Sequence, residues 1–344
     1  MKKNYILLLF LFFLGCARTQ TLNLQPHFYS ERPNQILWIQ LAGFSEEQIP
    51  LLKFNSAEAD YKSHLEQVDC VGKMWSFNLF QLRPSAHLSF LSQMTGTKNI
   101  QGKCNDFENP SLLSKFEEFG YAVSILENGA IGGQSLESAL MCPANNFLSV
   151  EKIRFYKMGT DLEGNKKSFH YQDSLEQVSQ FVKPGLYFDR SCQKSLCFST
   201  LSNNFKTLWQ QNLKTYSKNL FIVRDFNFQK ALLKKDLSLA KEALLEIERI
   251  VGDIRKNQNN QLLVVISGGE SLPIEFPFQG KEWGEYAKSG KNLFYKASSL
   301  MSPVTATGPM SENFCGIFDE VEIYKRLLFK PQDKKFNWDY LKPF

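Results

Sequence analysis

Short apolar runs alternate with amphipathic segments along this chain, and this alternation restricts the fold more than any other feature. The clearest pair is residues 236–256, whose apolar positions recur every three or four residues, followed by the apolar run 262–266. The first spacing is typical of a helix with one buried face, and the second of a buried strand. Residues 36–41, 121–126 and 219–223 predict further strands of the same kind.

Strands that alternate with helices predict an α/β fold with a mostly parallel central sheet and helices on both faces. Ligands of such folds bind beyond the carboxyl ends of the strands. No low-complexity linker or repeat divides residues 35–330, so we expect one domain there. Within it, residues 157–197 predict an irregular insertion, and residues 331–344 predict a C-terminal surface tail.

The first fifteen residues have the build of a signal peptide. Lys2 and Lys3 give a positive start, residues 6–14 form an unbroken apolar run, and Gly15 is a small residue before Cys16. The run is well under the roughly 20 residues that a spanning helix needs. We therefore expect residues 1–15 to be removed after export.

Residues 13–16, Phe-Leu-Gly-Cys, resemble the lipobox of bacterial lipoproteins, although that family usually has leucine in place of Phe13 and a small residue in place of Leu14. The resemblance implies that Cys16 is acylated and that residues 16–34 are a lipidated N-terminus and tether. Several acyl chains give stable membrane attachment. Ala17 resembles the residue after the cysteine in outer-membrane lipoproteins, which implies a cell-envelope location facing the periplasm. An ordinary cleaved signal is the alternative.

The charge of the chain argues against a nucleic-acid partner. Loss of residues 1–15 removes two lysines and no acidic residue, so the formal net charge falls from +5 to +3. This charge is small and dispersed along the chain, whereas nucleic-acid binding requires a concentrated basic surface. The expected partners are instead the membrane, through the lipid anchor, and an unidentified protein or glycan.

Five stretches of the chain, in this order, resemble the alkaline phosphatase superfamily, its sulfatases and phosphodiesterases in particular. They match the opening strand and turn, the nucleophile helix, the following helix and strand, the long helix, and the metal-binding strand: residues 36–44, 84–96, 111–128, 236–256 and 262–270. The resemblance implies an alkaline phosphatase-like fold. It also implies cations held by aspartates and histidines beside a hydroxyl or thiol nucleophile.

The side chains that this chemistry needs are missing at the matching positions. The first metal-binding aspartate of the family matches Ala42, and its aspartate–histidine pair matches Gly268 and Gly269. The nucleophile matches Leu82, which is unreactive. Methyl groups and glycines supply no ligand for a cation. We therefore expect no catalytic residue, metal or other cofactor.

Asp225 is the one matching ligand position that keeps a carboxylate. The phosphodiesterases have a histidine four residues later, and this chain has Gln229 there. We interpret Asp225 as an inherited structural residue, with metal binding as the alternative. Near the nucleophile position, Ser85, Ser89 and Thr95 are interpreted as capping and packing residues. His87 is interpreted as a surface residue or a hydrogen-bonded core residue. A serine hydrolase built from these residues is the alternative.

Loss of several ligands together predicts a pseudoenzyme, a non-catalytic envelope lipoprotein that binds or scaffolds where the family has its catalytic cleft. One alternative is a metal-dependent phosphodiesterase or sulfatase with ligands elsewhere. Four or more carboxylates or imidazoles near Pro84 and Ser267 would indicate it. The other is a structural envelope-assembly protein, which a filled cleft and a large exposed apolar patch would favour.

Six cysteines besides Cys16 are an even number, which favours disulfides in an exported chain. Cys192 and Cys197 are close enough in sequence for a local bridge. Cys70 and Cys104 bracket the segment that resembles the nucleophile helix, and elimination leaves Cys142 with Cys315. The predicted pairs are thus Cys192–Cys197, Cys70–Cys104 and Cys142–Cys315, with six free thiols as the alternative.

Lipidation can be tested at the mature amino terminus. We expect intact-mass and peptide mass spectrometry of the membrane-extracted protein to find Cys16 as the first residue, carrying acyl chains, because the apolar run before it is removed. A Cys16→Ser variant should lose the acyl mass. An unmodified terminus at any other residue would contradict the prediction.

Overall fold

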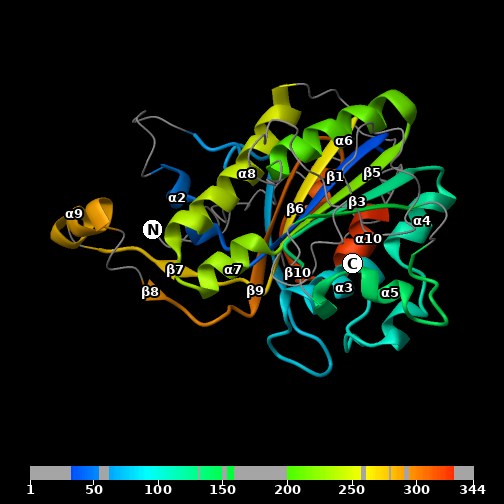
Figure 1. The fold of residues 1–344 in the computed structure, drawn as a ribbon, viewed down its shortest axis with the longest axis horizontal. Helices are drawn as coiled ribbons and strands as arrows, with labels where there is room; N and C mark the ends of the chain where they lie inside the picture. Colours follow the sequence, from blue (N-terminus) through cyan, green and yellow to red (C-terminus); the bar gives the residue numbers. More distant parts are fainter. Residues whose placement is uncertain are drawn as a thin grey trace, which may run out of the picture. The chain divides into compact units, whose positions relative to one another are not determined.

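The computed structural model describes residues 32–53, 62–130, 132–148, 153–158, 200–256, 261–278, 280–289 and 294–328. A sheet of eight strands runs through them in the order β10-β2-β9-β6-β1-β5-β3-β4 (Figure 1). The strands are β1 (Gln35–Ala42), β2 (Cys70–Trp75), β3 (Ala122–Asn128), β4 (Ile153–Met158), β5 (Asn219–Asp225), β6 (Leu262–Gly269), β9 (Met301–Thr307) and β10 (Gly316–Asp319).

Every neighbouring pair of strands is parallel except those that β9 forms with β2 and β6. All residues of β1, β5 and β6 are buried. Strands with helices on both sides lose the apolar–polar alternation of half-exposed strands, which explains their continuous apolar runs. The predicted strands within residues 36–41, 121–126, 219–223 and 262–266 are confirmed as parts of β1, β3, β5 and β6.

Helices cover both faces of this sheet. One face packs against α3 (Ala86–Thr95), α4 (Leu112–Glu118) and α10 (Glu322–Leu328). The other packs against α6 (Leu201–Thr215), α7 (Asn227–Leu233) and α8 (Leu237–Lys256). The predicted α/β fold, with a mostly parallel sheet between two helical layers, is therefore confirmed. None of the described helices is both long and apolar enough to cross a membrane.

Capping residues fix where these helices begin. The Asp236 carboxylate accepts a hydrogen bond from the Leu239 amide at 3.0 Å, at the start of α8. Ser111 caps α4 by accepting from the amides of Leu113 and Ser114. Its hydroxyl also donates to the Phe147 carbonyl at 2.5 Å, which holds Ser111 in the capping position.

The remaining elements are short. After β1, Ser45 caps a 3-10 turn, Glu46–Gln48, which is followed by α2 (Pro50–Lys53). A two-stranded sheet of β7 (Ile274–Glu275) and β8 (Phe294–Tyr295) lies beside α9 (Gly280–Ser289). Short helical turns, which include α5 (Glu137–Leu140) and the 3-10 turns Cys104–Phe107, Gly132–Gln134 and Ser311–Phe314, complete the described elements.

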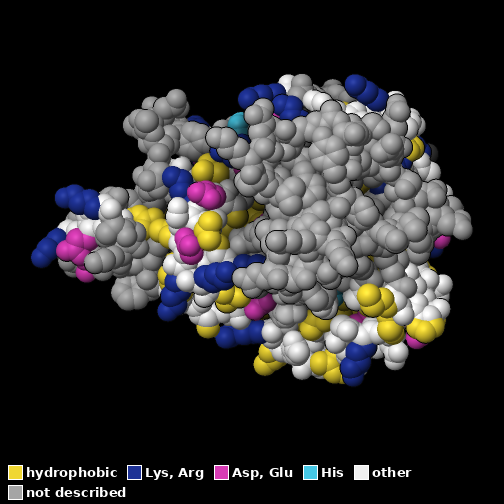
Figure 2. Space-filling view, in the orientation of Figure 1, with side chains coloured by type: hydrophobic (Ala, Val, Ile, Leu, Met, Phe, Trp, Pro, Cys, Tyr) yellow, Lys and Arg dark blue, Asp and Glu magenta, His cyan; other side chains and the backbone are white. Residues whose placement is uncertain are grey.

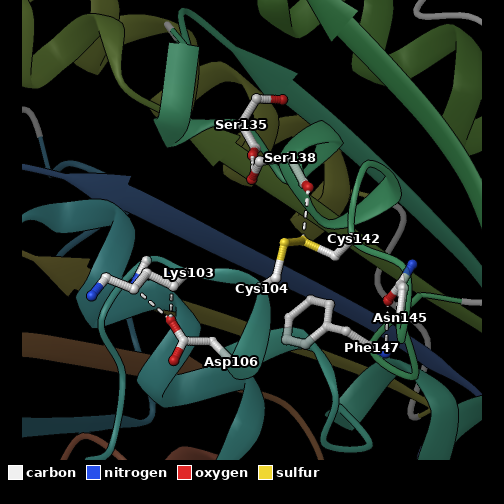
Figure 3. The surroundings of a disulfide bond; sticks show 9 residues. Lys103, Cys104, Asp106, Ser135, Ser138, Cys142, Asn145 and Phe147 are labelled. Atoms are coloured by element: carbon white, nitrogen blue, oxygen red, sulfur yellow. Dashed lines mark hydrogen bonds between the residues drawn. A yellow bond between two sulfur atoms is a disulfide. The ribbon is translucent and has the colours of Figure 1, made fainter.

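Two disulfides differ from the predicted pairs. Cys70 bonds to Cys315, and Cys104 bonds to Cys142, each with α-carbons 5.3 Å apart. Cys70 begins β2 and Cys315 precedes β10, so the parallel pairing of these two strands brings the cysteines together. Figure 3 shows the second bond, which joins the start of the 3-10 turn Cys104–Phe107 to the segment after α5, beside Phe147. The predicted pairs Cys70–Cys104 and Cys142–Cys315 are therefore wrong.

Several predictions lie outside the described residues. They are the signal peptide 1–15, Cys16, the tether up to residue 31, nearly all of the insertion 157–197 with the Cys192–Cys197 pair, and the tail 331–344. Only Lys157 and Met158 of the predicted insertion are described, and they end the regular strand β4.

Candidate functional site

The carboxyl ends of four neighbouring strands meet at one edge of the sheet. Leu41 of β1 is level with Asp225 of β5 and with Gly268 of β6, and Asp225 is level with Asn128 of β3. The positions that the resemblance marked on these strands therefore come together, as expected for parallel strands of one sheet. We call the strand ends at Ala42, Asp225 and Gly269 the candidate site.

An apolar cluster fills the candidate site. Five buried residues contact one another there, from β1, the start of α3, and the loops after β3 and β5: Ala42, Ala86, Phe90, Ala130 and Phe226. The rings of Phe90 and Phe226 pack edge to face with centroids 5.8 Å apart. None of these side chains can ligate a cation.

Phe90 occupies the space that a side chain at position 269 would need. A β-carbon built on Gly269 would lie 2.6 Å from Cε1 of Phe90, well inside van der Waals contact. A β-carbon on Gly268 would lie 3.1 Å from the Phe44 carbonyl and from Pro303. An aspartate–histidine pair would fit here only if the ring of Phe90 moved away and the neighbours of Gly268 shifted. The residues present therefore do not fit the divalent cations that the superfamily's fold implies.

A carboxylate at the end of β6 links three elements in this region. Oε2 of Glu270 accepts a hydrogen bond from the Ala86 amide at the start of α3, at 2.9 Å. The same oxygen accepts from Nε2 of Gln229 on α7, at 2.6 Å. Hydrogen bonds to a charged acceptor are among the stronger ones in proteins. Gln229, at the position of the family's histidine, thus binds a carboxylate of the chain itself.

A buried polar row lies directly beneath the apolar cluster. Gln40, Arg224 and Glu127 are level with one another on β1, β5 and β3. Nε of Arg224 donates to Gln40 at 3.0 Å, and the same guanidinium forms a fully buried ion pair with Glu127. The rings of Phe90 and Phe226 lie over it, with centroids 5.7 and 5.4 Å from Cζ, within cation–π distance.

His87 of α3 completes the buried polar row. Its Nδ1 lies 3.3 Å from Nη2 of Arg224. Burial, together with the neighbouring positive charge of Arg224, lowers the pKa of His87 to about 3. The imidazole is therefore neutral at physiological pH and accepts a hydrogen bond from the guanidinium. Burial also lowers the pKa of Arg224, and the charge of Glu127 opposes that shift.

A second buried network holds the middle of α3. Ser89 donates to the carboxyl group of Glu320, which is fully buried. Gln93 accepts from Ser267 at 2.7 Å and donates to the Gly268 carbonyl at 3.0 Å. Burial raises the pKa of Glu320 to about 8, an effect that hydrogen bonds from neighbouring side chains only partly oppose. Helix α3 is thus fixed to the sheet by polar contacts as well as by Phe90.

The other candidate nucleophiles do not form a catalytic arrangement. Ser85 caps α3 by accepting from the Leu88 amide, and Thr95 donates to the Leu91 carbonyl at 2.8 Å. The position of the family's nucleophile, Leu82, is 75% exposed on the loop before α3. Within the described ranges, no three His, Cys, Asp or Glu side chains are grouped so that they could hold a metal ion.

Asp225 accepts hydrogen bonds just before α7, beside a cavity. Its carboxylate accepts from Nδ2 of Asn128 at 2.6 Å and from the Phe228 amide at the start of α7, at 3.0 Å. Burial raises its pKa to about 6, although these hydrogen bonds oppose the shift. A cavity of about 690 Å³ opens beside Asp225, between α6, α7 and α8. Its described lining includes Met158 and Ala243.

The sequence did not reveal the residues that fill the candidate site. Phe90 is one of 30 phenylalanines, and nothing in its spacing distinguishes it from an ordinary core residue. The burial of Arg224 and Glu127 left a clearer signal in the sequence. Each is a charged residue near the end of an apolar run, where burial requires a partner of opposite charge. That signal predicts an ion pair but does not identify its members.

No protein-family model and no curated protein matches the sequence. The fold is similar to that of solved alkaline phosphatases. That of the Antarctic bacterium TAB5 matches with a TM-score of 0.62 and 14% identity, over 87% of this chain and 98% of that chain. The alkaline phosphatase of Thermus thermophilus matches with a TM-score of 0.63 and 9% identity, over 86% of this chain and 91% of that chain. The alkaline phosphatase of a Shewanella species matches with a TM-score of 0.60 and 10% identity, over 86% of this chain and 98% of that chain. The chain therefore has an alkaline phosphatase-like fold, as the resemblance implied.

The contact between Phe90 and position 269 can be measured by a double-mutant cycle. We expect Gly269→Ala to destabilise the protein by about 1–3 kcal/mol, because the added methyl group overlaps the ring. In a Phe90→Ala background the same change should cost far less, so urea unfolding should give a coupling energy above 0.5 kcal/mol in magnitude. Gly133→Ala, at a glycine with open space around it, is the matched control. Additive effects of the two changes would contradict the filled site.

Glu320 should make stability depend on pH. Its pKa is about 8 in the folded protein, whereas the ordinary pKa of a glutamate is 4.5, so unfolding releases a proton between these pH values. The free energy of unfolding therefore falls as pH rises from 4.5 to 8, by on the order of 4 kcal/mol relative to Glu320→Gln. Chemical denaturation at several pH values measures this. Glu322→Gln is the control, and an equal effect of both variants would contradict the assignment.

Proposed function

We propose that this protein is a non-catalytic, envelope-anchored protein that uses an alkaline phosphatase-like fold to bind or scaffold. The observation that carries the proposal is the position of Phe90, whose ring fills the space that a ligand side chain at Gly269 would occupy. An enzyme of this superfamily needs that space for cations that neutralise phosphoryl or sulfuryl charge. Packing of an aromatic ring there replaces the catalytic function with a structural one.

Contacts between protein side chains also provide the structural links that bound cations would provide in a two-metal site. In a two-metal site, cations join side chains from several strands and loops. Here Glu270 joins β6 to α3 and α7, and the Arg224–Glu127 pair joins β5 to β3. These contacts hold the strands and helices of the site together without a cation. This supports a chain whose fold is kept for a purpose other than ester hydrolysis.

A binding role is supported by the cavity beside the filled centre. The pseudoenzyme hypothesis placed the ligand in the family's catalytic cleft, but the apolar cluster occupies the strand ends themselves. The cavity of about 690 Å³ lies next to them, with apolar walls from α7 and α8 and charged groups, Lys230, Glu246 and Arg249, among its lining. Its volume is in the range of small-molecule sites, which suits one residue of a glycan or peptide.

Two observations, one from the sequence and one from the structure, support the proposed envelope location. Residues 1–16 have the build of a lipoprotein signal. The two disulfides of the described residues favour an oxidising compartment such as the periplasm. The anchor and the compartment are parts of the proposal, and mass spectrometry of the amino terminus tests the anchor separately.

A combined metal and ester assay tests the lack of catalysis. The purified full chain is titrated with Zn²⁺, Ca²⁺ and Mg²⁺ by calorimetry, then incubated with a phosphate monoester, a phosphate diester and a sulfate ester. We expect no saturable binding of the metal ions and hydrolysis equal to the rate without protein, because the strand ends hold no ligand set.

Asp225→Asn is the matched variant for this assay, because Asp225 is the one carboxylate at a retained ligand position. Wild type and variant should behave alike. Hydrolysis that rises with the concentration of wild-type protein and is lost in Asp225→Asn would overturn the proposal. It would indicate a metal-dependent phosphodiesterase or sulfatase instead.

A further inference from the structure

An apolar turn is exposed between β2 and α3. Leu79, Phe80 and Leu82 are 70%, 52% and 75% exposed, and Arg83 beside them is exposed as well. Single exposed apolar side chains are ordinary, but three within four residues form a patch. β2 runs in the same direction as β1, because β9 is antiparallel to both β2 and β6. The turn therefore lies at the same edge of the sheet as the candidate site.

Hydrogen bonds hold this turn in shape. Oδ1 of Asn78 accepts from the amides of Phe80 and Gln81 at 2.9 and 2.7 Å, and the Asn78 amide donates to the Gln81 carbonyl at 3.0 Å. The Leu79 amide donates to the Lys98 carbonyl at 3.0 Å, which ties the turn to the loop after α3. These hydrogen bonds hold the backbone of the turn in a defined conformation, in which Leu79, Phe80 and Leu82 are exposed.

The patch is convex and has cationic neighbours. Figure 1 shows the loop between β2 and α3 extending from the sheet at the lower margin of the view, and Figure 2 shows hydrophobic side chains there with Lys and Arg among them. Nζ of Lys98 lies 3.5 Å from the centroid of the Phe77 ring, at the base of the turn, and is ion-paired with Asp319 at 3.0 Å, so Arg83 is the cation of the patch that remains for a surface. Arg83 has no ion-pair partner among the described residues. A protruding apolar tip beside cations suits a lipid surface, which has no fixed shape to match.

We propose that this turn inserts into the membrane surface. Leu79, Phe80 and Leu82 enter the boundary between headgroups and acyl chains, and Arg83 stays among anionic headgroups. The inference rests on the proposed envelope anchoring, which places the protein at a membrane. The chain that follows the proposed anchor joins the sheet at the opposite edge, at the start of β1. Residues 17–31 can extend to about 50 Å, and the eight residues of β1 span only about 26 Å, so anchor and turn can reach one bilayer.

Brominated lipids test this contact, because bromine on an acyl chain quenches tryptophan fluorescence only at short range. The full chain carrying Phe80→Trp is purified in detergent and reconstituted into vesicles of phosphatidylethanolamine and phosphatidylglycerol, with or without acyl-chain bromine. The signal of the introduced indole is the difference from wild type, which has five tryptophans of its own. We expect bromination to reduce that difference at least twofold. Leu82→Trp gives a second variant if the first does not fold.

Leu213→Trp is the matched control. Leu213 is an exposed leucine near the end of α6, whose chain leads into β5 at the opposite edge of the sheet. Quenching at position 80 but not at position 213 supports insertion of the turn. Protein that stays with the vesicles without quenching at position 80 overturns the insertion and leaves the anchor in place, and equal quenching at both positions also overturns it. Protein that leaves the vesicles overturns the anchoring, and the insertion with it.

Discussion

The buried charge of Arg224 is the constraint on which the candidate site depends. A guanidinium with no exposed surface is costly unless it is paired and hydrogen-bonded. Glu127, Gln40 and His87 supply those contacts from two strands and from α3. Removal of one partner from a buried ion pair typically costs about 3–5 kcal/mol. The strand ends and the first turns of α3 are therefore fixed relative to one another by a contact that cannot be loosened cheaply.

The apolar cluster follows from that constraint. Phe90 and Phe226 cover the guanidinium and keep water from the ion pair, which strengthens the pair because the local dielectric is low. The ring of Phe90 needs a glycine at position 269, so ring and glycine form one unit. Together with Glu270, these contacts link strands and helices at the carboxyl edge of the sheet. The apolar cluster fills the strand ends at Ala42 and Gly269.

Because the apolar cluster fills the strand ends, the features that could bind a ligand or a membrane lie beside it. The cavity beside Asp225 and the turn at Leu79–Phe80–Leu82 both lie at the carboxyl edge of the sheet, on either side of the filled centre. Parallel strands direct their loops to this edge, so the same topology that places an active site there in α/β enzymes also places these features. A binding or scaffolding protein can use this edge without any catalytic group.

The sequence by itself determined the architecture. Apolar runs predicted the strands around Trp38, Ile222 and Val265, and apolar residues at helical spacing predicted the helix after Asp236. These elements were predictable because the spacing of apolar residues within a short segment distinguishes a buried strand from an amphipathic helix. The resemblance also led us to predict that Ala42 and Gly269 stand at ligand positions without a ligand. Only the tertiary structure decided what fills their place and how the cysteines pair. The contact of Phe90 with Gly269 and the bond of Cys70 to Cys315 join residues far apart in the chain. Strand order and helix packing bring them together, and no local pattern specifies either.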